Sequence, residues 1–216
     1  MLELKHIYFA YDIGSPYVLK DINLQVHDGD YISVVGENGS GKSTLMKILL
    51  AYSSKTKNTK KVAEAIYEQI KDQGEVDLLD IKKQRKKLEK EYDFYILGAW
   101  TDKTNANKNM QRFIDQQEIH SKDVALFLTC GVPREHYHAD DSINNYIAFM
   151  EERNNRIHET FVCQGKVDPK VMIVFKILTW RDPNFIHKVT PDLADMVKES
   201  KKHPDPKDLK DAQNCF

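Results

Sequence analysis

The sequence has few cysteines and no long apolar run. Its three cysteines, Cys130, Cys163 and Cys215, are an odd number without CxxC spacing, which argues against a disulfide framework or zinc site and fits a reducing compartment. The longest apolar run, residues 171–178, contains Lys176 and is far shorter than the roughly 20 residues that a membrane span needs. The N-terminus lacks the basic-then-apolar pattern of a secretory signal. We therefore expect a cytoplasmic protein.

Neither sign of charge is in excess. The 32 Lys and Arg residues balance 33 Asp and Glu residues, giving a formal net charge of −1. This balance offers no electrostatic basis for binding nucleic acid or an anionic membrane. A chain of 216 residues with 41% hydrophobic side chains can form one full α/β domain and a small appendage.

Residues 47–74 predict a strand, a loop and a helix in succession. The apolar run 48–51 suits a strand buried on both faces, and the hydroxyl-rich loop 53–59 follows it. The apolar side chains that then recur with the spacing of one helix face are Val62, Ala63, Ile66, Tyr67 and Ile70. Gly74 stands where a helix C-cap is expected. Such a unit is typical of the first phosphate-binding segment of a nucleotide- or flavin-binding α/β domain.

Four more strands are expected to alternate with helices. The predicted strands are residues 76–81, 92–98, 123–129 and 158–163. The first predicted helix carries Met110, Phe113 and Ile114, and the second spans residues 143–150 with an N-cap at 140–142. Three more helices are expected to begin at Asp168-Pro169, Thr190-Pro191 and Asp205-Pro206. The charged residues 82–91 are expected to form an exposed helix or loop.

Five strands alternating with helices predict a doubly wound parallel sheet. Ligands of such sheets bind beyond the carboxyl ends of the strands, at the point where the strand order reverses. The loops 53–59, 99–105 and 129–138 follow three of the predicted strands. We therefore expect these loops to form a single site.

The first 45 residues have a different character. Residues 2–7 and 22–26 alternate apolar and polar side chains, as half-buried strands do. Residues 31–35 read as a buried strand that leads into a full Walker A motif, residues 36–44. In this motif the glycines let backbone N–H groups surround a phosphate, Lys42 reaches the terminal phosphates and Ser43 is placed to hold Mg²⁺.

This segment resembles the opening of ABC-transporter ATP-binding subunits, with Tyr11 where that family stacks an aromatic ring on adenine. The residues that the resemblance assigns to ATP and Mg²⁺ are Tyr11, Gly36, Asn38, Gly39, Gly41, Lys42, Ser43 and Thr44. The family's Q-loop, signature motif, Walker B strand and switch histidine are missing from residues 45–216, so ATP hydrolysis is not expected. We expect residues 1–45 to be a truncated, β-rich ATPase-like appendage.

Two different structures are predicted for residues 45–50. A Walker A loop needs them as the start of a helix, whereas the following α/β domain needs them as its first strand. We expect the strand to form, because a complete domain depends on it.

Residues 46–216 resemble the flavodoxin family. Ser54-x-Thr56-x-Asn58-Thr59 is similar to the family's FMN-phosphate loop, and residues 98–103, 163–169 and 203–212 are similar to a bacterial and archaeal flavodoxin-like subfamily. The resemblance implies an FMN protein that transfers electrons between redox partner proteins. The residues that it assigns to FMN are Ser54, Lys55, Thr56, Lys57, Asn58, Thr59, Ala99, Trp100, Thr101, Asp102, Thr129, Cys130 and Gly131. It implies no catalytic acid or base and no metal.

Within that site, hydroxyl groups and backbone N–H groups of residues 54–59 would hold the phosphate, and Trp100 would stack on the isoalloxazine. Lys57 departs from the family, which usually has glycine there. If the position needs a positive φ, lysine costs about 1 kcal/mol or more. In return, Lys55, Lys57, Lys60 and Lys61 bring positive charge toward the phosphate.

Outside these loops the assignments are simpler. The sequence His136-Tyr137-His138 lacks a further ligand for a metal at suitable spacing, so contact with flavin is the better interpretation. Cys130 could be redox-active, but a small loop residue is favoured. Trp180 is expected to pack in the interior. Two further functions stay open: an FMN enzyme that reduces a small molecule such as a quinone, and an ATP-binding protein that uses Lys42.

Overall fold

The computed structural model describes residues 2–10, 14–27, 29–30, 46–72, 74–182 and 190–216. The predicted strand 31–35, the Walker A motif 36–44 and Tyr11 lie outside the described residues. Among the described helices, none is both long and apolar enough to cross a bilayer.

A parallel sheet forms the centre of the molecule. Its strands are β3 (Lys47–Tyr52), β4 (Glu75–Asp80), β5 (Phe94–Asp102), β7 (Asp123–Cys130) and β8 (Arg156–Gln164). They lie in the order β4-β3-β5-β7-β8, and every neighbouring pair is parallel. Leu50 of β3 lies opposite Leu78 of β4 on one side and Ile96 of β5 on the other. The predicted five-stranded parallel sheet is confirmed, and the strand order reverses between β3 and β5.

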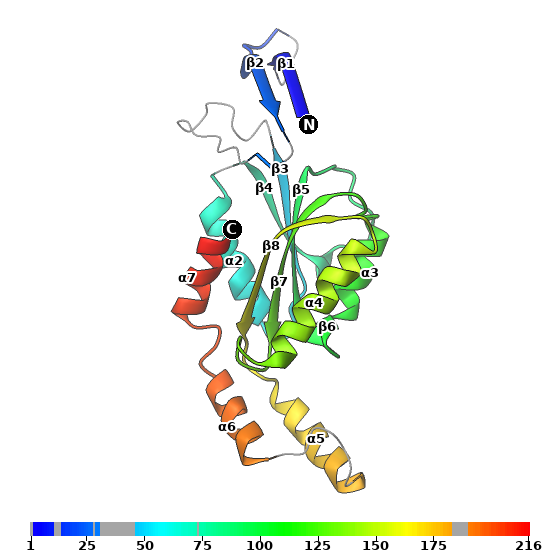
Figure 1. The fold of residues 1–216 in the computed structure, drawn as a ribbon, viewed down its shortest axis with the longest axis vertical. Coiled ribbons are helices and arrows are strands. Elements are labelled where there is room, and N and C mark those ends of the chain that lie inside the picture. The colour runs from blue at the N-terminus through cyan, green and yellow to red at the C-terminus, as the bar shows by residue number, and fades with distance from the viewer. Residues whose placement is uncertain (1, 11–13, 28, 31–45, 73, 183–189) are drawn as a thin grey trace.

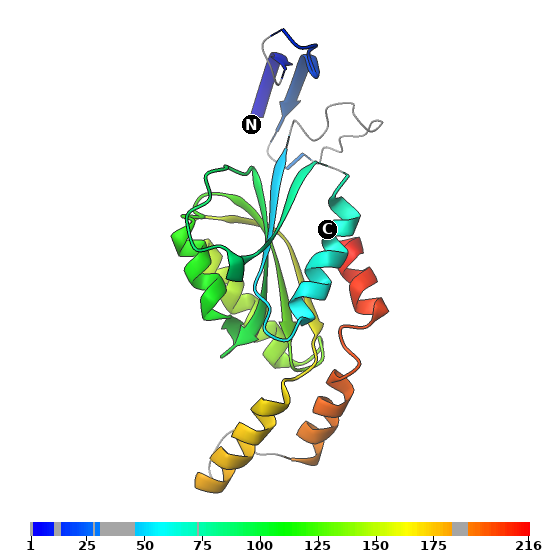
Figure 2. The same cartoon turned by 180° about the vertical axis from the view of Figure 1, so that it is seen from behind.

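Helices cover both faces of the sheet (Figures 1 and 2). Helices α2 (Asn58–Ile70) and α7 (Pro206–Cys215) pack on one face, where Leu50, Phe127 and Phe161 are buried beneath them. Helices α3 (Lys108–Gln116) and α4 (Tyr137–Glu151) pack on the other face with Met110 and Tyr146 in its core. The fold is therefore doubly wound, as predicted.

Two helices extend past the carboxyl edge of the sheet (Figure 1). They are α5 (Pro169–Arg181) and α6 (Pro191–Ser200), and both start where predicted. The Asp168 side chain caps α5 by accepting from the Lys170 N–H at 2.9 Å, and the Thr190 hydroxyl accepts from the Leu193 N–H of α6 at 3.2 Å. The prediction that Trp180 packs in the interior is wrong, because its side chain on α5 is 83% exposed.

The N-terminal strands form a sheet of their own. Strands β1 (Leu2–Phe9) and β2 (Leu19–Val26) pair antiparallel, with Leu4 opposite Leu24. Both were predicted, although each is longer than its periodic stretch. Of residues 45–50, for which two structures were predicted, residues 47–50 belong to strand β3, as expected, and Leu45 lies outside the described residues.

Three further boundaries differ from the prediction by more than two residues. Helix α2 ends at Ile70 rather than at Gly74, and its C-cap Lys71 still has right-handed geometry and donates its N–H to the Tyr67 carbonyl at 2.8 Å. Helix α4 begins at Tyr137 rather than after residues 140–142, because the His136 Nδ1 caps it by accepting from the His138 N–H at 3.2 Å.

The third difference concerns residues 99–105, which were predicted to be a loop. Strand β5 instead continues to Asp102 and turns back into the short strand β6 (Asn105–Ala106). Thr101 pairs with Ala106 across this hairpin, a contact that follows from chain reversal and not from local residue pattern. The charged segment after β4 contains a short 3₁₀ helix, η1 (Ile81–Lys83), and otherwise forms a loop.

Candidate functional site

The site lies at the carboxyl ends of β3 and β5, where the strand order reverses. The Ser53 N–H donates to the Gly98 carbonyl at 2.8 Å and so joins the two strand ends. The Asn107 side-chain amide donates to the Ser53 hydroxyl at 2.9 Å, which ties the start of α3 to the same point. Doubly wound sheets bind their ligands at this position.

The loop from β3 enters α2 through Lys57, whose φ of 70° and ψ of 2° are left-handed. Glycine adopts this backbone conformation without strain. Lys57 therefore has the positive φ at which a lysine side chain was expected to cost free energy. The first turn of α2 contains no acidic residue and its N-cap makes no side-chain hydrogen bond. The N–H groups of this turn and the helix dipole are therefore available to an anion.

Asn58 anchors the loop to the far side of the site. Its side-chain amide donates to the Thr56 hydroxyl at 3.0 Å and to the Lys166 carbonyl at 2.9 Å. Gly165 makes this approach feasible, since a Cβ there would lie 2.7 Å from the Asn58 Nδ2. The phosphate-sized loop is thus held against the connection between β8 and α5, a segment that is distant in sequence.

Two buried hydroxyls at the site lack a hydrogen-bond partner among the described residues: Ser54 Oγ and Thr101 Oγ1. A buried polar group left unpaired costs about 1–3 kcal/mol, so two of them beside one loop cluster indicate a polar ligand. The Thr59 hydroxyl instead lies 2.9 Å from the Thr129 hydroxyl and links α2 to β7. Of the hydroxyls expected to contact the cofactor, Ser54 and Thr101 are therefore the ones without a partner in the described part of the chain.

The lysines around the loop are partly engaged by acidic groups. Lys55 Nζ lies 3.7 Å from Asp168 Oδ2 and 5.8 Å from the centroid of the Trp100 ring. Lys60 Nζ lies 3.3 Å from Glu64 Oε1 along α2. These contacts reduce the positive charge that Lys55 and Lys60 were expected to direct toward a phosphate.

Lys82 was not predicted as a site residue. Its ammonium group donates to the Ser54 carbonyl and so fixes the loop that precedes α2.

A cavity of about 200 Å³ opens between these segments. It brings together eight of the residues predicted for FMN: Lys55, Thr56, Asn58, Trp100, Thr101, Thr129, Cys130 and Gly131. It is also lined by Gly165, Lys166, Val167 and Asp168, a fourth segment that sequence reasoning missed as part of the site. The signal for it was present, because Gly165 directly follows the fifth strand and so reaches the same edge.

Five predicted cofactor residues do not line this cavity: Ser54, Lys57, Thr59, Ala99 and Asp102. Ala99 is fully buried in the core on the α3–α4 side, and Asp102 lines neither of the two cavities at this edge. Both sit in the extension of β5, where successive side chains point to opposite faces. Of residues 99–102, Trp100 and Thr101 are the two that line the smaller cavity.

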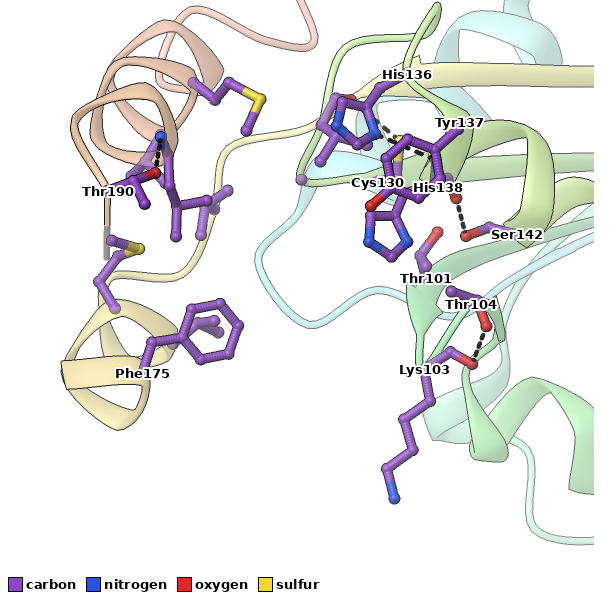
Figure 3. A pocket seen from close by; sticks show the side chains of 18 residues that line it. Thr101, Lys103, Thr104, Cys130, His136, Tyr137, His138, Ser142, Phe175 and Thr190 are labelled. Carbon is purple, nitrogen blue, oxygen red and sulfur yellow. Dashed lines mark hydrogen bonds between the residues drawn. The ribbon is translucent and has the colours of Figure 1, made fainter. Parts of the chain in front are cut away.

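A second cavity of about 820 Å³ adjoins the first one (Figure 3). One wall consists of side chains from α5 and α6, and the other includes Thr101, Thr104 and the start of α4. The rings of His136, Tyr137 and His138 line it, with centroids of neighbouring rings 4.5 Å apart.

Cys130 lies between the two cavities and contributes to both. Burial raises the pKa of its thiol to about 11, and the thiol also donates to the Val132 carbonyl at 3.2 Å. Burial likewise raises the pKa of Cys163. A thiol of this kind stays protonated at neutral pH. Cys130 is the last residue of β7 and not a loop residue as predicted.

The N-terminal part of the chain is similar to ATP-binding proteins of transporters. One relative, an ABC transporter ATP-binding protein of Clostridium perfringens (strain 13 / Type A), is 29% identical over 141 residues, which is 61% of this chain. This chain spans only 22% of that protein.

The larger part of the chain is similar to flavodoxins. A family model described as a flavodoxin domain matches residues 49–216. The flavodoxin-like domain-containing protein BilS of Clostridioides difficile (strain CD3) is 32% identical over 168 residues, covering 77% of this chain and 92% of BilS. Among solved structures, oxidised flavodoxin 1 of Bacillus cereus is 16% identical with a TM-score of 0.46, covering 72% of this chain and 95% of that one. The chain belongs to the flavodoxin family.

Proposed function

We propose that this protein binds FMN at the carboxyl edge of its sheet and carries electrons between redox partner proteins. The observation that carries the proposal is the pair of buried hydroxyls, Ser54 Oγ and Thr101 Oγ1, that have no partner among the described residues. Ser54 opens the phosphate-sized loop, and Thr101 lines both cavities. FMN offers a phosphate to the first group and ring and ribityl polar atoms to the second.

Each segment would have a distinct task. The N–H groups at the start of α2, with the hydroxyls of Ser54 and Thr56, would hold the phosphate, and the helix dipole would favour its negative charge. Trp100, which lines the smaller cavity, would stack on the ring system. When bound, FMN itself supplies the electron-transfer chemistry, and the protein tunes it by stacking, hydrogen bonding and exclusion of water.

The alternative is a self-contained reductase, in which NAD(P)H and a small molecule reach the flavin directly. A carrier needs only an accessible cofactor edge and partner proteins that donate and accept electrons.

The visible absorption spectrum of the purified protein tests this function. We expect yellow protein that releases FMN at a near-equimolar yield, or colourless protein that becomes yellow on incubation with FMN. Protein that stays colourless after incubation with FMN would refute the proposal. Rapid turnover with NAD(P)H and a quinone, without any partner protein, would favour the enzyme over the carrier.

Two neighbouring serines provide a matched pair of variants. Ser54→Ala removes a hydroxyl without a protein partner, so the apoprotein should keep its stability while FMN binding weakens. Ser53→Ala instead removes the hydroxyl that accepts from the Asn107 side-chain amide. This amide loses its partner, so the apoprotein should lose about 1–3 kcal/mol of stability. Weaker FMN binding only in the Ser53 variant would contradict the assignment of Ser54.

We also infer that the chain consists of two units, residues 1–45 and 46–216. The similarity to ATP-binding proteins, which extends over 141 residues and so beyond the first unit, supports nucleotide recognition by Lys42. Titration with a fluorescent ATP analogue tests it: binding that survives Lys42→Ala would exclude a Walker A site. FMN binding should be the same in the wild type and in the Lys42→Ala variant.

A further inference from the structure

Helix α5 exposes an apolar face to solvent. The side chains of this outer face are Ile173, Val174, Ile177, Leu178 and Trp180, which are between 36% and 83% exposed. Spacings of three or four residues place them on one side of the helix. Among the described residues, ten large apolar side chains are exposed, and these five are half of them. The outer face is therefore a concentrated patch, unlike the single exposed apolar residues that are normal on protein surfaces.

The inner side of α5 is also apolar, but it faces the protein. Val171, Met172 and Phe175 line the larger cavity, and Figure 3 shows the ring of Phe175 turned toward it. A helix that is apolar all round normally lies in the core of a large protein or in lipid. No side chain of α5 is buried, so the described part of the chain leaves the outer face uncovered.

The charges on α5 are all positive. Lys170, Lys176 and Arg181 are exposed, and the helix contains no Asp or Glu. None of the three forms an ion pair with a described acidic residue. Long basic side chains lay their methylene groups along apolar surface and keep the charge at its rim. The chain as a whole has a net charge of −1, but this helix combines apolar area with uncompensated positive charge.

The position of α5 leaves it accessible to a large surface. Helices α5 and α6 extend past the carboxyl edge of the sheet, and the small sheet of β1 and β2 lies at the opposite end of the molecule (Figures 1 and 2). An element at the end of the molecule can meet an extended surface before the rest of the domain does.

Charge and size argue against a second copy of this chain as the occupant of the outer face. Two faces that carry only cations repel each other. A helix of 13 residues is about 20 Å long and about 10 Å wide, so its face covers about 200 Å², well below the about 800 Å² per partner of a stable interface. A bilayer has no such requirement, because a single helix inserts its apolar side chains among the headgroups while anionic lipids attract Lys and Arg.

We propose that α5 docks this protein on an anionic lipid bilayer, with the outer face in the headgroup region. The helix lies on the membrane and does not span it, since its length of about 20 Å is shorter than the hydrocarbon core of about 30 Å. Trp180, the most exposed side chain of the face, is of the type that favours the membrane–water interface.

This docking goes beyond FMN binding and does not depend on it. Because α5 extends past the carboxyl edge of the sheet, docking would bring that edge toward the bilayer. Only the statement that FMN would then lie on the membrane side rests on the proposed function.

Co-sedimentation with vesicles tests the docking. The full-length protein, without FMN, is mixed with vesicles of phosphatidylcholine alone or of equal parts of phosphatidylcholine and phosphatidylglycerol. We expect binding to the anionic vesicles to be about tenfold tighter or more, and to weaken as the ionic strength rises.

Two exposed aromatic residues at opposite ends of the molecule provide matched variants. Trp180→Ala should weaken binding to anionic vesicles about tenfold by removing apolar area from the outer face. Tyr17→Ala, on the N-terminal sheet, should leave binding unchanged. The two side chains are 83% and 55% exposed, so neither substitution alters the core.

Lysine variants test whether the cations of α5 make the contact. Lys176→Ala should weaken binding to anionic vesicles about fivefold. Lys86→Ala removes an exposed lysine from the more basic segment 82–91 and should have no effect. An equal loss in both variants would show that any surface cation suffices, and the proposal would be wrong.

Tryptophan fluorescence shows whether the outer face enters the lipid. The chain has two tryptophans, so Trp100→Phe leaves Trp180 as the only one. Its emission in the protein without FMN should shift to shorter wavelength when anionic vesicles are added. Bound protein with unchanged emission would mean that charge alone holds it at the surface, which contradicts insertion of the face.

Two further outcomes would overturn the proposal. One is failure to bind anionic vesicles, or binding that Trp180→Ala leaves unchanged. The other is a dimer in size-exclusion chromatography that Trp180→Ala dissociates, because a second copy would then cover the face. Failure to bind FMN would refute the proposed function alone, since vesicle binding is measured without FMN.

Discussion

Replacement of Lys57 by glycine should stabilise the apoprotein. Lys57 has a φ of 70°, and a side chain in this region costs about 1–2 kcal/mol that glycine avoids. Glycine also gives the unfolded chain more freedom, which offsets about 0.4–1 kcal/mol of that gain. We therefore expect Lys57→Gly to raise the free energy of unfolding by about 0.5–1 kcal/mol. For a chain of this size, that corresponds to an increase of about 1–4 °C in Tm.

The same variant should bind FMN less tightly. An exposed ammonium near a phosphate contributes about 1 kcal/mol in water, which corresponds to about a fivefold change in Kd. Salt screens an exposed charge, so the difference should shrink as the ionic strength rises. FMN titrations followed by quenching of flavin fluorescence at low and high salt would measure both effects.

Lys57→Ala is the matched control because it removes the charge but keeps a Cβ in the left-handed region. It should share the weaker FMN binding of Lys57→Gly without the gain in stability. Urea denaturation of the three apoproteins compares them directly. If the glycine variant is no more stable than the alanine variant, the argument from backbone strain at this position is wrong.

Three further predictions concern the core, the acid limb of stability and thiol reactivity. Gly98→Ala should lower the free energy of unfolding by about 1–3 kcal/mol in urea denaturation, because a Cβ would lie 1.9 Å from the Phe127 ring. Burial alone would raise the pKa of Asp77, but hydrogen bonds, led by the one from Lys90, lower it. The ionised Asp77 therefore stabilises the fold above its ordinary pKa of 3.8, and this stabilisation is lost as the pH falls through the lower pKa of the folded state. Asp77→Asn should therefore flatten the loss of stability below about pH 4 in acid titrations followed by circular dichroism. The Cys130 thiol, with its pKa raised by burial to about 11, should resist iodoacetamide in the native protein at about pH 8 and react after unfolding, as measured by mass spectrometry.

Local residue pattern was enough to predict the sheet and most helices. Strands β3 and β7 are short apolar runs, the pattern of a strand buried on both faces. Helices α5, α6 and α7 begin at a capping side chain followed by proline, a signal that acts within a few residues. Parallel topology then places the loops after successive strands at one edge. That is why eight of the predicted FMN residues line one cavity.

The remaining features depend on contacts between distant segments. Residues 99–102 form a strand rather than a loop because Ala99 and Trp100 pair with β7 and the next two residues pair with β6, and Ala99 is buried in the core. The partners of Thr59 and Asn58 lie 70 and 108 residues away in sequence. No periodicity or cap signal encodes such contacts.

The sequence by itself thus determined the family, the parallel sheet and the edge where the site forms, because these follow from periodicity and from motifs that act locally. Only the tertiary structure decided which hydroxyls stay unpaired, which lysines are engaged by acidic groups, and that α5 and α6 enclose a second cavity beside the first. The physical reason is that hydrogen bonding and burial at each of these positions are set by side chains from several elements at once.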